Sequence, residues 1–163
     1  MKTAKEVLLQ LLNKEEKAFV SVLDAVPADK FDWKPDPKAA TAKERASQIA
    51  LEGQGVADVL TKGVLVYDPA TAPNYASTAE MAAAFKTGMA AAKDALAKMT
   101  DADWESDAKM MLGDKEVWKA TKGDMAFELM LDLIHHRGQL SVYLRPMGGK
   151  VPSIYGPSAD TAE

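Results

Sequence analysis

The 163-residue chain contains no cysteine. Disulfides, thiolate catalysis and cysteine-based zinc sites are therefore excluded. The chain also lacks an uninterrupted apolar run of about 18 residues, so no membrane-spanning helix is predicted. The apolar stretch at 7–12 is too short and too interrupted for a signal peptide. These absences lead us to expect a protein of the reducing cytoplasm.

Clustered basic charge is absent as well. The chain has 20 Lys and Arg against 24 Asp and Glu, for a net charge of −4, and the basic residues are spread along its length. Because phosphate binding needs a clustered basic face, no nucleic-acid partner is expected. The 47% of apolar residues is sufficient for one domain with a full core, spanning 1–163.

Apolar residues recur at helical spacing in four segments of the chain. These segments cover about 3–25, 42–61, 78–98 and 122–145. Four helices of this length joined by loops predict an all-α protein with the architecture of a four-helix bundle. The residues from 146 to 163 are expected to form a C-terminal loop tail.

The second helix has a clear start signal. Thr41 is followed three residues later by Glu44, which is the pattern of a capping box. The segment 101–120 fits no helix of comparable length. Its apolar residues flank Gly113-Asp114, a pair typical of turns, so a short hairpin or an extended excursion would fit.

Residues capable of chemistry concentrate in the last predicted helix. The run 135–145 contains both histidines of the chain, and Asp132 lies one turn before His136. Side chains four apart meet on one helix face, which suits two ligands of one metal ion. Bundle metal sites draw their ligands from facing helices, so a third ligand must come from elsewhere. Gln48 and Glu52, four apart on the second helix, are the candidates.

Simpler interpretations of these residues stay open. Asp132 and His136 would also form a plain ion pair or hydrogen bond at this spacing. A Gln–Asp–His set favours Mg, Mn or Fe(II) over tight zinc binding. We further expect Arg137 to pair with an acidic group of a neighbouring helix or subunit. Gly138 would allow close helix packing, and Gln139 would orient a neighbour by hydrogen bonding.

The run His-His-Arg-Gly-Gln-Leu-Ser-Val-Tyr-Leu-Arg at 135–145, followed by Val-Pro-Ser-Ile-Tyr-Gly-Pro-Ser at 151–158, closely resembles the last helix and tail of the DinB-like superfamily. The loop Trp-Lys-Pro-Asp-Pro at 33–37, leading into 44–50, is similar to the segment before and within its second helix. The helix number and order agree over nearly the whole chain. The resemblance implies a DinB/YfiT-like bundle of up-down-down-up topology, often a homodimer.

The resemblance also implies a metal site. Many members bind a divalent metal, commonly zinc or nickel, through one histidine on the second helix and two histidines four apart on the last. Here these positions fall at Gln48, Asp132 and His136, so two of the three ligands are substituted. His135 matches a neighbouring histidine that is usually not a ligand. The Gln–Asp–His set could hold a harder metal such as Mn or Fe, and Glu52 could replace Gln48.

Two functional hypotheses follow from this pattern. Some members are transferases or isomerases that use a low-molecular-weight thiol such as bacillithiol or mycothiol. The resemblance therefore implies a divalent-metal-dependent thiol transferase or hydrolase with an altered metal site. The substituted ligands favour the alternative, a non-catalytic, metal-free bundle that binds a small molecule or acts as a dimeric interaction protein.

Overall fold

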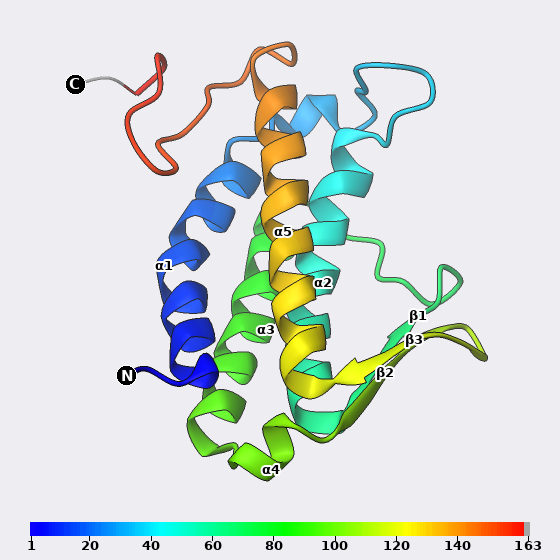
Figure 1. The fold of residues 1–163 in the computed structure, drawn as a ribbon. Coiled ribbons are helices and arrows are strands. Elements are labelled where there is room, and N and C mark those ends of the chain that lie inside the picture. Colours follow the sequence, from blue (N-terminus) through cyan, green and yellow to red (C-terminus); the bar gives the residue numbers. More distant parts are fainter. Residues whose placement is uncertain (162–163) are drawn as a thin grey trace.

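The computed structural model describes residues 1–161, which form five α-helices and a three-stranded sheet (Figure 1). Along the chain these elements are α1 (Ala4–Asp24), α2 (Ala42–Lys62), β1 (Val64–Tyr67), α3 (Thr78–Lys98), α4 (Asp101–Trp104), β2 (Asp107–Leu112), β3 (Lys115–Thr121) and α5 (Lys122–Leu144). In the view of Figure 1, α1 and α5 run upward, whereas α2 and α3 run downward. The chain after α5 is a tail without helix or strand. The predicted tail extends to residue 163, so its last two positions lie outside the described residues.

The four long helices lie where the apolar periodicity predicts them, and each end agrees to within one residue. Local signals account for this agreement. Thr41 Oγ1 accepts a hydrogen bond from the Glu44 backbone N–H at 3.1 Å, and the Glu44 carboxylate accepts one from the Thr41 N–H at 2.7 Å. This capping box satisfies N–H groups that the first turn of α2 would otherwise leave unpaired.

The all-α prediction holds only in part, because the protein also contains a sheet. Its strand order is β1-β2-β3, with β1 parallel to β2 and β2 antiparallel to β3. Of the two possibilities left open for 101–120, a hairpin or an extended excursion, the hairpin is present and turns at Gly113, whose φ of 57° favours glycine. The parallel partner β1 was not predicted, since its four residues are too few to show a strand period.

Helices α2 and α3 approach each other closely at two glycines. A Cβ on Gly88 would lie 2.5 Å from the backbone carbonyl of Gly53, and a Cβ on Gly53 would lie 2.7 Å from the ring of Phe85. Neither position accommodates a side chain without a shift of its neighbours. With the helices this close, Phe85 packs against Phe19 of α1 with ring centroids 4.9 Å apart, at the centre of the core.

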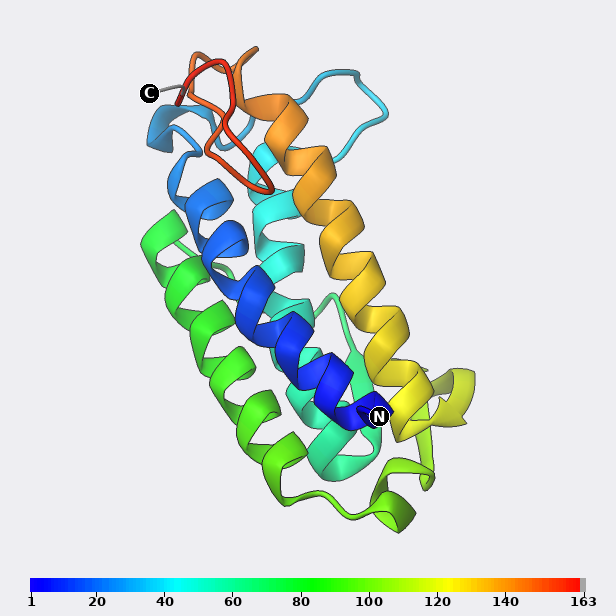
Figure 2. The same cartoon turned by 60° about the vertical axis from the view of Figure 1, so that its left-hand side comes forward.

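A buried ion pair joins α1 to α5. Arg137 Nη1 donates to Glu15 Oε2 at 2.5 Å, and both side chains are only 2% exposed. This contact confirms that Arg137 pairs with an acidic group of a neighbouring helix. Tyr155 of the tail completes the cluster, because its hydroxyl accepts from Arg137 Nη2 at 2.6 Å and donates to Glu15 Oε2 at 2.8 Å. These bonds attach the tail to α1 and α5, and Figure 2 shows the tail (red) lying over the upper ends of these two helices.

The expectation that Gly138 allows close helix packing is wrong. No atom of the described residues outside its own helix backbone and chain neighbours lies within 4 Å of a Cβ built at this position. Gly138 instead faces outward on α5, where a side chain would meet open space. Gly88 provides a comparison, because it also lies within a helix but is packed between α2 and α3.

Substitution of these two glycines should give opposite results. Gly88→Ala should lower the free energy of unfolding by about 1–3 kcal/mol, because α2 and α3 must move apart. Gly138→Ala should leave it unchanged or raise it by up to about 1 kcal/mol, through the higher helix propensity of alanine. Chemical denaturation of both variants measures the difference, and equal effects would contradict the close contact of α2 with α3.

The hydroxyl of Tyr155 should contribute to tail attachment. Tyr155→Phe retains the ring but removes its two hydrogen bonds, which should cost about 0.5–1.5 kcal/mol each and hasten proteolysis of the tail. Tyr67→Phe is the control, since Tyr67 is exposed and its hydroxyl forms no hydrogen bond within residues 1–161. Limited proteolysis followed by mass spectrometry reports the cleavage rate. Equal rates in the two variants would show that the hydroxyl does not hold the tail.

Candidate metal centre

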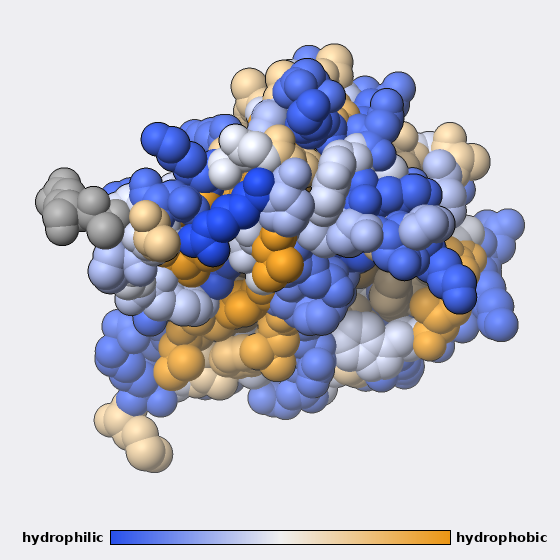
Figure 3. Space-filling view, turned by 90° about the horizontal axis from the view of Figure 1, so that it is seen from above, coloured by the Kyte–Doolittle hydropathy of each residue, from blue (hydrophilic) through white to orange (hydrophobic). Residues whose placement is uncertain are grey.

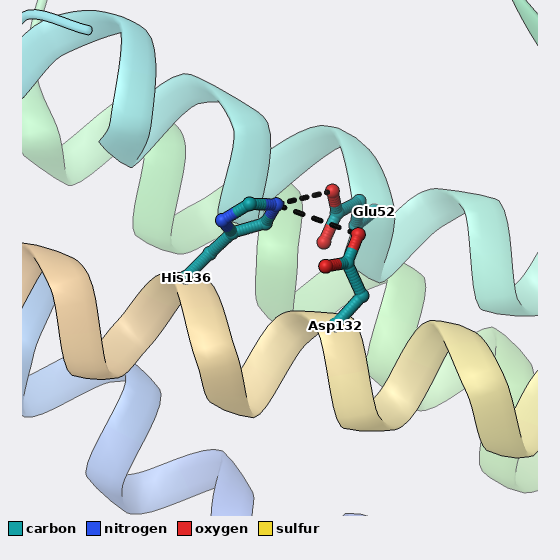
Figure 4. A group of neighbouring side chains, drawn as sticks. All are labelled: Glu52, Asp132 and His136. Atoms are coloured by element: carbon teal, nitrogen blue, oxygen red, sulfur yellow. Dashed lines mark ion pairs between the residues drawn. The ribbon is translucent and has the colours of Figure 1, made fainter. Parts of the chain in front are cut away.

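Three ionisable side chains meet between α2 and α5. Figure 4 shows Glu52 pointing from α2 toward Asp132 and His136, which lie one turn apart on α5. His136 Nε2 is 3.4 Å from Glu52 Oε1 and 3.4 Å from Asp132 Oδ2. One atom from each residue lies within 4.8 Å of the other two. One imidazole nitrogen and two carboxylates at this separation form a group that could hold a metal ion.

Gln48 lies in the same cluster but directs its amide nitrogen toward it. Its Nε2 donates to Glu52 Oε1 at 2.9 Å and lies 2.6 Å from His136 Nε2. Its Oε1 accepts from Arg45 Nη1 at 2.6 Å. Because arginine can only donate, this bond fixes which end of the amide faces the cluster. Gln48 would have to rotate to act as a ligand, whereas Glu52 already presents an oxygen.

Each ring nitrogen of His136 lies close to an N–H donor of α2, Nδ1 to Arg45 and Nε2 to Gln48. With the proton on Nδ1, the ring donates to Gln139 Oε1 at 3.0 Å, and Nε2 accepts from Gln48. With the proton on Nε2, that N–H would face the Gln48 N–H at 2.6 Å. With the proton on Nδ1, however, that N–H faces the Arg45 Nη1 donor at 2.8 Å. Each tautomer therefore sets one donor against another, and coordination of an ion by Nε2 requires the proton on Nδ1, where Gln139 Oε1 can accept it.

Gln139 links the two histidines. Its Oε1 accepts from His136, and its Nε2 lies 2.8 Å from His135 Nε2. This confirms that Gln139 orients a neighbour by hydrogen bonding, and such outer bonds commonly fix the ring of a metal-binding histidine. His135 itself is exposed and lies outside the group that could hold a metal.

Sequence reasoning missed Arg45. It lies three residues before Gln48, one helical turn away on the same face of α2, and that spacing was the available signal. Arginine was overlooked because it is not a metal ligand. Its role in the cluster is to orient Gln48.

The cluster is buried at one end and open at the other. The side chains of His136 and Glu52 are 9% and 13% exposed, whereas that of Asp132 is 50% exposed. The stripe of α5 that carries Asp132 and His136 is otherwise buried and consists of Met125, Leu129, Leu140 and Tyr143. The cluster is thus open to solvent on the side of Asp132.

Burial is the main reason that the pKa of Glu52 rises from its ordinary value of 4.5 to about 8. The negative charge of Asp132 raises it further, while the hydrogen bond from Gln48 and the charge of Arg45 act in the opposite direction. Glu52 Oε2 is buried and has no hydrogen-bond partner among residues 1–161. In the absence of a cation, Glu52 therefore retains its proton at neutral pH, and a bound cation would take the place of that proton.

The sequence profile of the DinB family matches residues 1–163, the whole chain. The chain belongs to the DinB family. No curated protein matches it. A DinB-like protein from Bacillus cereus has a similar crystal structure, with a TM-score of 0.67 and 21% identity over 91% of this chain and 95% of that one. A DinB-like protein from Bacillus subtilis gives a TM-score of 0.66 and 18% identity over 95% and 99% of the two chains.

At these identities the two crystal structures support the fold of this DinB family protein but carry no information about its candidate metal centre. None of its helices within residues 1–161 is both long and apolar enough to cross a membrane.

The stability of this DinB family protein should depend on pH through Glu52. Between about pH 4.5 and 8, folded Glu52 holds a proton that the unfolded chain has lost, so stability falls as pH rises. The decline is at most about 1.4 kcal/mol per pH unit. Glu52→Gln carries no titrating group there and should lack this decline.

Thermal unfolding of metal-free protein across this pH range measures the effect. Glu105→Gln, which alters an exposed carboxylate remote from the cluster, is the matched control and should follow the wild-type profile. Parallel profiles for wild type and Glu52→Gln would contradict a raised pKa at Glu52.

Proposed function

We propose that this protein binds a divalent metal ion through Glu52, Asp132 and His136 and uses it for hydrolysis or thiol transfer. The observation that carries the proposal is the meeting of three donor atoms within 4.8 Å of one another, beside the unpaired buried oxygen of Glu52. A buried carboxylate oxygen without a hydrogen-bond donor requires a cation, a proton or water as its partner. The residues present therefore fit a metal ion.

The donor set guides the choice of metal. One imidazole nitrogen and two carboxylates suit Mn, Fe(II) and Zn better than the softer ions that prefer thiolates, and Ni remains a candidate through the histidine. When bound, a divalent ion with three protein ligands lowers the pKa of a coordinated water or thiol, so that a nucleophile forms near neutral pH.

The side chains of the cluster have separate roles in this proposal. Glu52 loses its proton as the ion enters, so binding releases a proton and strengthens as pH rises toward 8. His136 contributes Nε2 because Gln139 accepts the proton on Nδ1. Asp132, half exposed, faces the approaching reactant. Gln48 and Arg45 hold the α2 side of the site in place.

Of the two reactions, the carboxylate-rich donor set favours activation of water and hence hydrolysis. Thiol transfer requires a low-molecular-weight thiol from solution, such as bacillithiol or mycothiol, because the chain has no cysteine. The proposal locates the protein in the cytoplasm, where such thiols stay reduced.

A specific observation favours a second function. Gln48 links His136 to Glu52, and protonation of Glu52 removes its repulsion from Asp132. The three side chains can therefore lie this close together without a bound ion. The protein would then be a non-catalytic, metal-free bundle that binds a small molecule or acts as an interaction protein.

Homodimerisation is part of the proposal in either case. Leu131 and Val142 of α5 are 58% and 72% exposed, and with Gly138 they form one outward stripe. Apolar side chains also gather along one flank of the bundle in the end view of Figure 3. Packing of this stripe against its symmetry copy would remove apolar surface from water.

Metal content separates the two functions. Protein purified without chelator, then incubated with Mn, Fe, Ni or Zn salts, should retain about one ion per chain by mass spectrometry, and a saturating ion should raise the melting temperature. Asp132→Ala and His136→Ala should each lose the ion. Glu128→Gln, at an exposed carboxylate one turn earlier on α5, should retain it. Absence of metal from wild type would support the metal-free bundle, whereas an ion retained equally by all variants would show that it binds away from Asp132 and His136.

A further inference from the structure

Two buried side-chain atoms lack a hydrogen-bond partner within residues 1–161, and both belong to the same cluster. One is Glu52 Oε2 and the other is Arg45 Nε. Since buried polar atoms are nearly always paired, each atom indicates a missing partner. The proposed ion accounts for Glu52 Oε2, which is an acceptor. Arg45 Nε is a donor on a cation, so a metal ion cannot satisfy it.

Only one corner of the Arg45 guanidinium is engaged. Nη1 donates to Gln48 Oε1 at 2.6 Å and lies 2.8 Å from His136 Nδ1. Nε and Nη2, which form one edge of the group, donate to no atom of the described residues, and no carboxylate there lies within ion-pair distance. This edge presents two parallel N–H groups, the geometry that matches the two oxygens of a carboxylate or phosphate.

The surroundings favour a carboxylate. Glu52 and Asp132 lie beyond Gln48 and His136 from this edge, and the charge of Asp132 repels added negative charge. A carboxylate carries one charge, whereas phosphate carries up to two near neutral pH, and the repulsion is correspondingly larger.

We propose that Arg45 binds the carboxylate of the substrate, which makes a small organic carboxylate the substrate class of this site. The inference rests on the proposed function, because it takes the reacting part of the substrate to lie at the group formed by Glu52, Asp132 and His136. Nη1 of the same guanidinium touches Gln48 and His136, so a carboxylate on the free edge lies beside that group.

The test uses acetate and inorganic phosphate as probes of the full chain, in metal-free and zinc-loaded form. Nuclear magnetic resonance of the Arg45 Nε–Hε group reports binding directly. Acetate should shift this resonance saturably. Arg45→Gln should weaken acetate binding by roughly tenfold to a hundredfold, the range for a hydrogen bond to a charged group. Arg45→Lys keeps the positive charge but lacks the two parallel N–H groups, so its acetate affinity should lie between those of wild type and Arg45→Gln.

Lys43→Gln is the matched control, because it removes a positive charge two residues away on α2, where Lys43 donates to Asn74 outside the cluster. It should bind acetate as wild type does. Circular dichroism and melting temperature establish that each variant is folded, and the Arg45→Lys variant preserves the test if Arg45→Gln unfolds.

Metal content of the same samples keeps this inference distinct from the proposed function. If Arg45→Gln loses acetate binding but retains zinc, the result supports both the carboxylate site and the proposed metal function. An Arg45-dependent acetate shift in a protein that never binds metal supports the anion site and overturns the metal function. Equal acetate affinity in Arg45→Gln and wild type, no shift of the Arg45 resonance, or tighter binding of phosphate than of acetate overturns the inference.

Discussion

The position of α2 depends on a backbone contact between two glycines. Gly53 and Gly88 leave no space for side chains where α2 meets α3, so the helices approach at backbone distance. Glu52 directly precedes Gly53 in sequence, and consecutive helical residues point about 100° apart. Once Gly53 faces α3, Glu52 must face a different neighbour, and that neighbour is α5 (Figures 1 and 4). The packing of α2 against α3 thus directs the Glu52 carboxylate toward the candidate metal centre.

The placement of α5 follows a similar rule. His136 and Arg137 are adjacent, so one points toward α2 and the other toward α1. The buried pair of Arg137 with Glu15 costs desolvation of two charges, which the short hydrogen bonds and the Tyr155 hydroxyl offset in part. Because a charge buried without its partner would be strongly destabilising, the pair fixes how α5 is rotated. That rotation is what brings His136 to Glu52.

The cluster itself combines two acids, a cation and a neutral amide. Glu52 and Asp132 cannot both ionise cheaply in a partly buried position, so one retains a proton unless a cation joins them. Arg45 lowers this cost only partly and keeps an unpaired edge. The site is therefore incomplete in two complementary ways, with an acceptor oxygen suited to a cation and a donor edge suited to an anion. A metal ion and a carboxylate substrate would satisfy both.

Much of the fold was predictable because its signals are local. Helix ends depend on caps such as Thr41 with Glu44, and the hairpin depends on a turn at Gly113; both can be read from a few neighbouring residues. The parallel pairing of β1 with β2 joins segments more than 40 residues apart, and no pattern of neighbouring residues predicts it. The exposure of Gly138 could not be predicted from the sequence either, since the packing of the surrounding helices determines which face of α5 is covered.

For the site, the sequence by itself determined the helical spacing of Asp132 and His136 and offered Gln48 and Glu52 as partners from a facing helix. The tertiary structure decided how each partner is oriented. Arg45 takes the oxygen of the Gln48 amide, so the nitrogen faces the cluster and Glu52 supplies the available oxygen. The physical reason is that an amide orients by its hydrogen-bond partners, and these are set by packing between helices rather than by spacing along one helix.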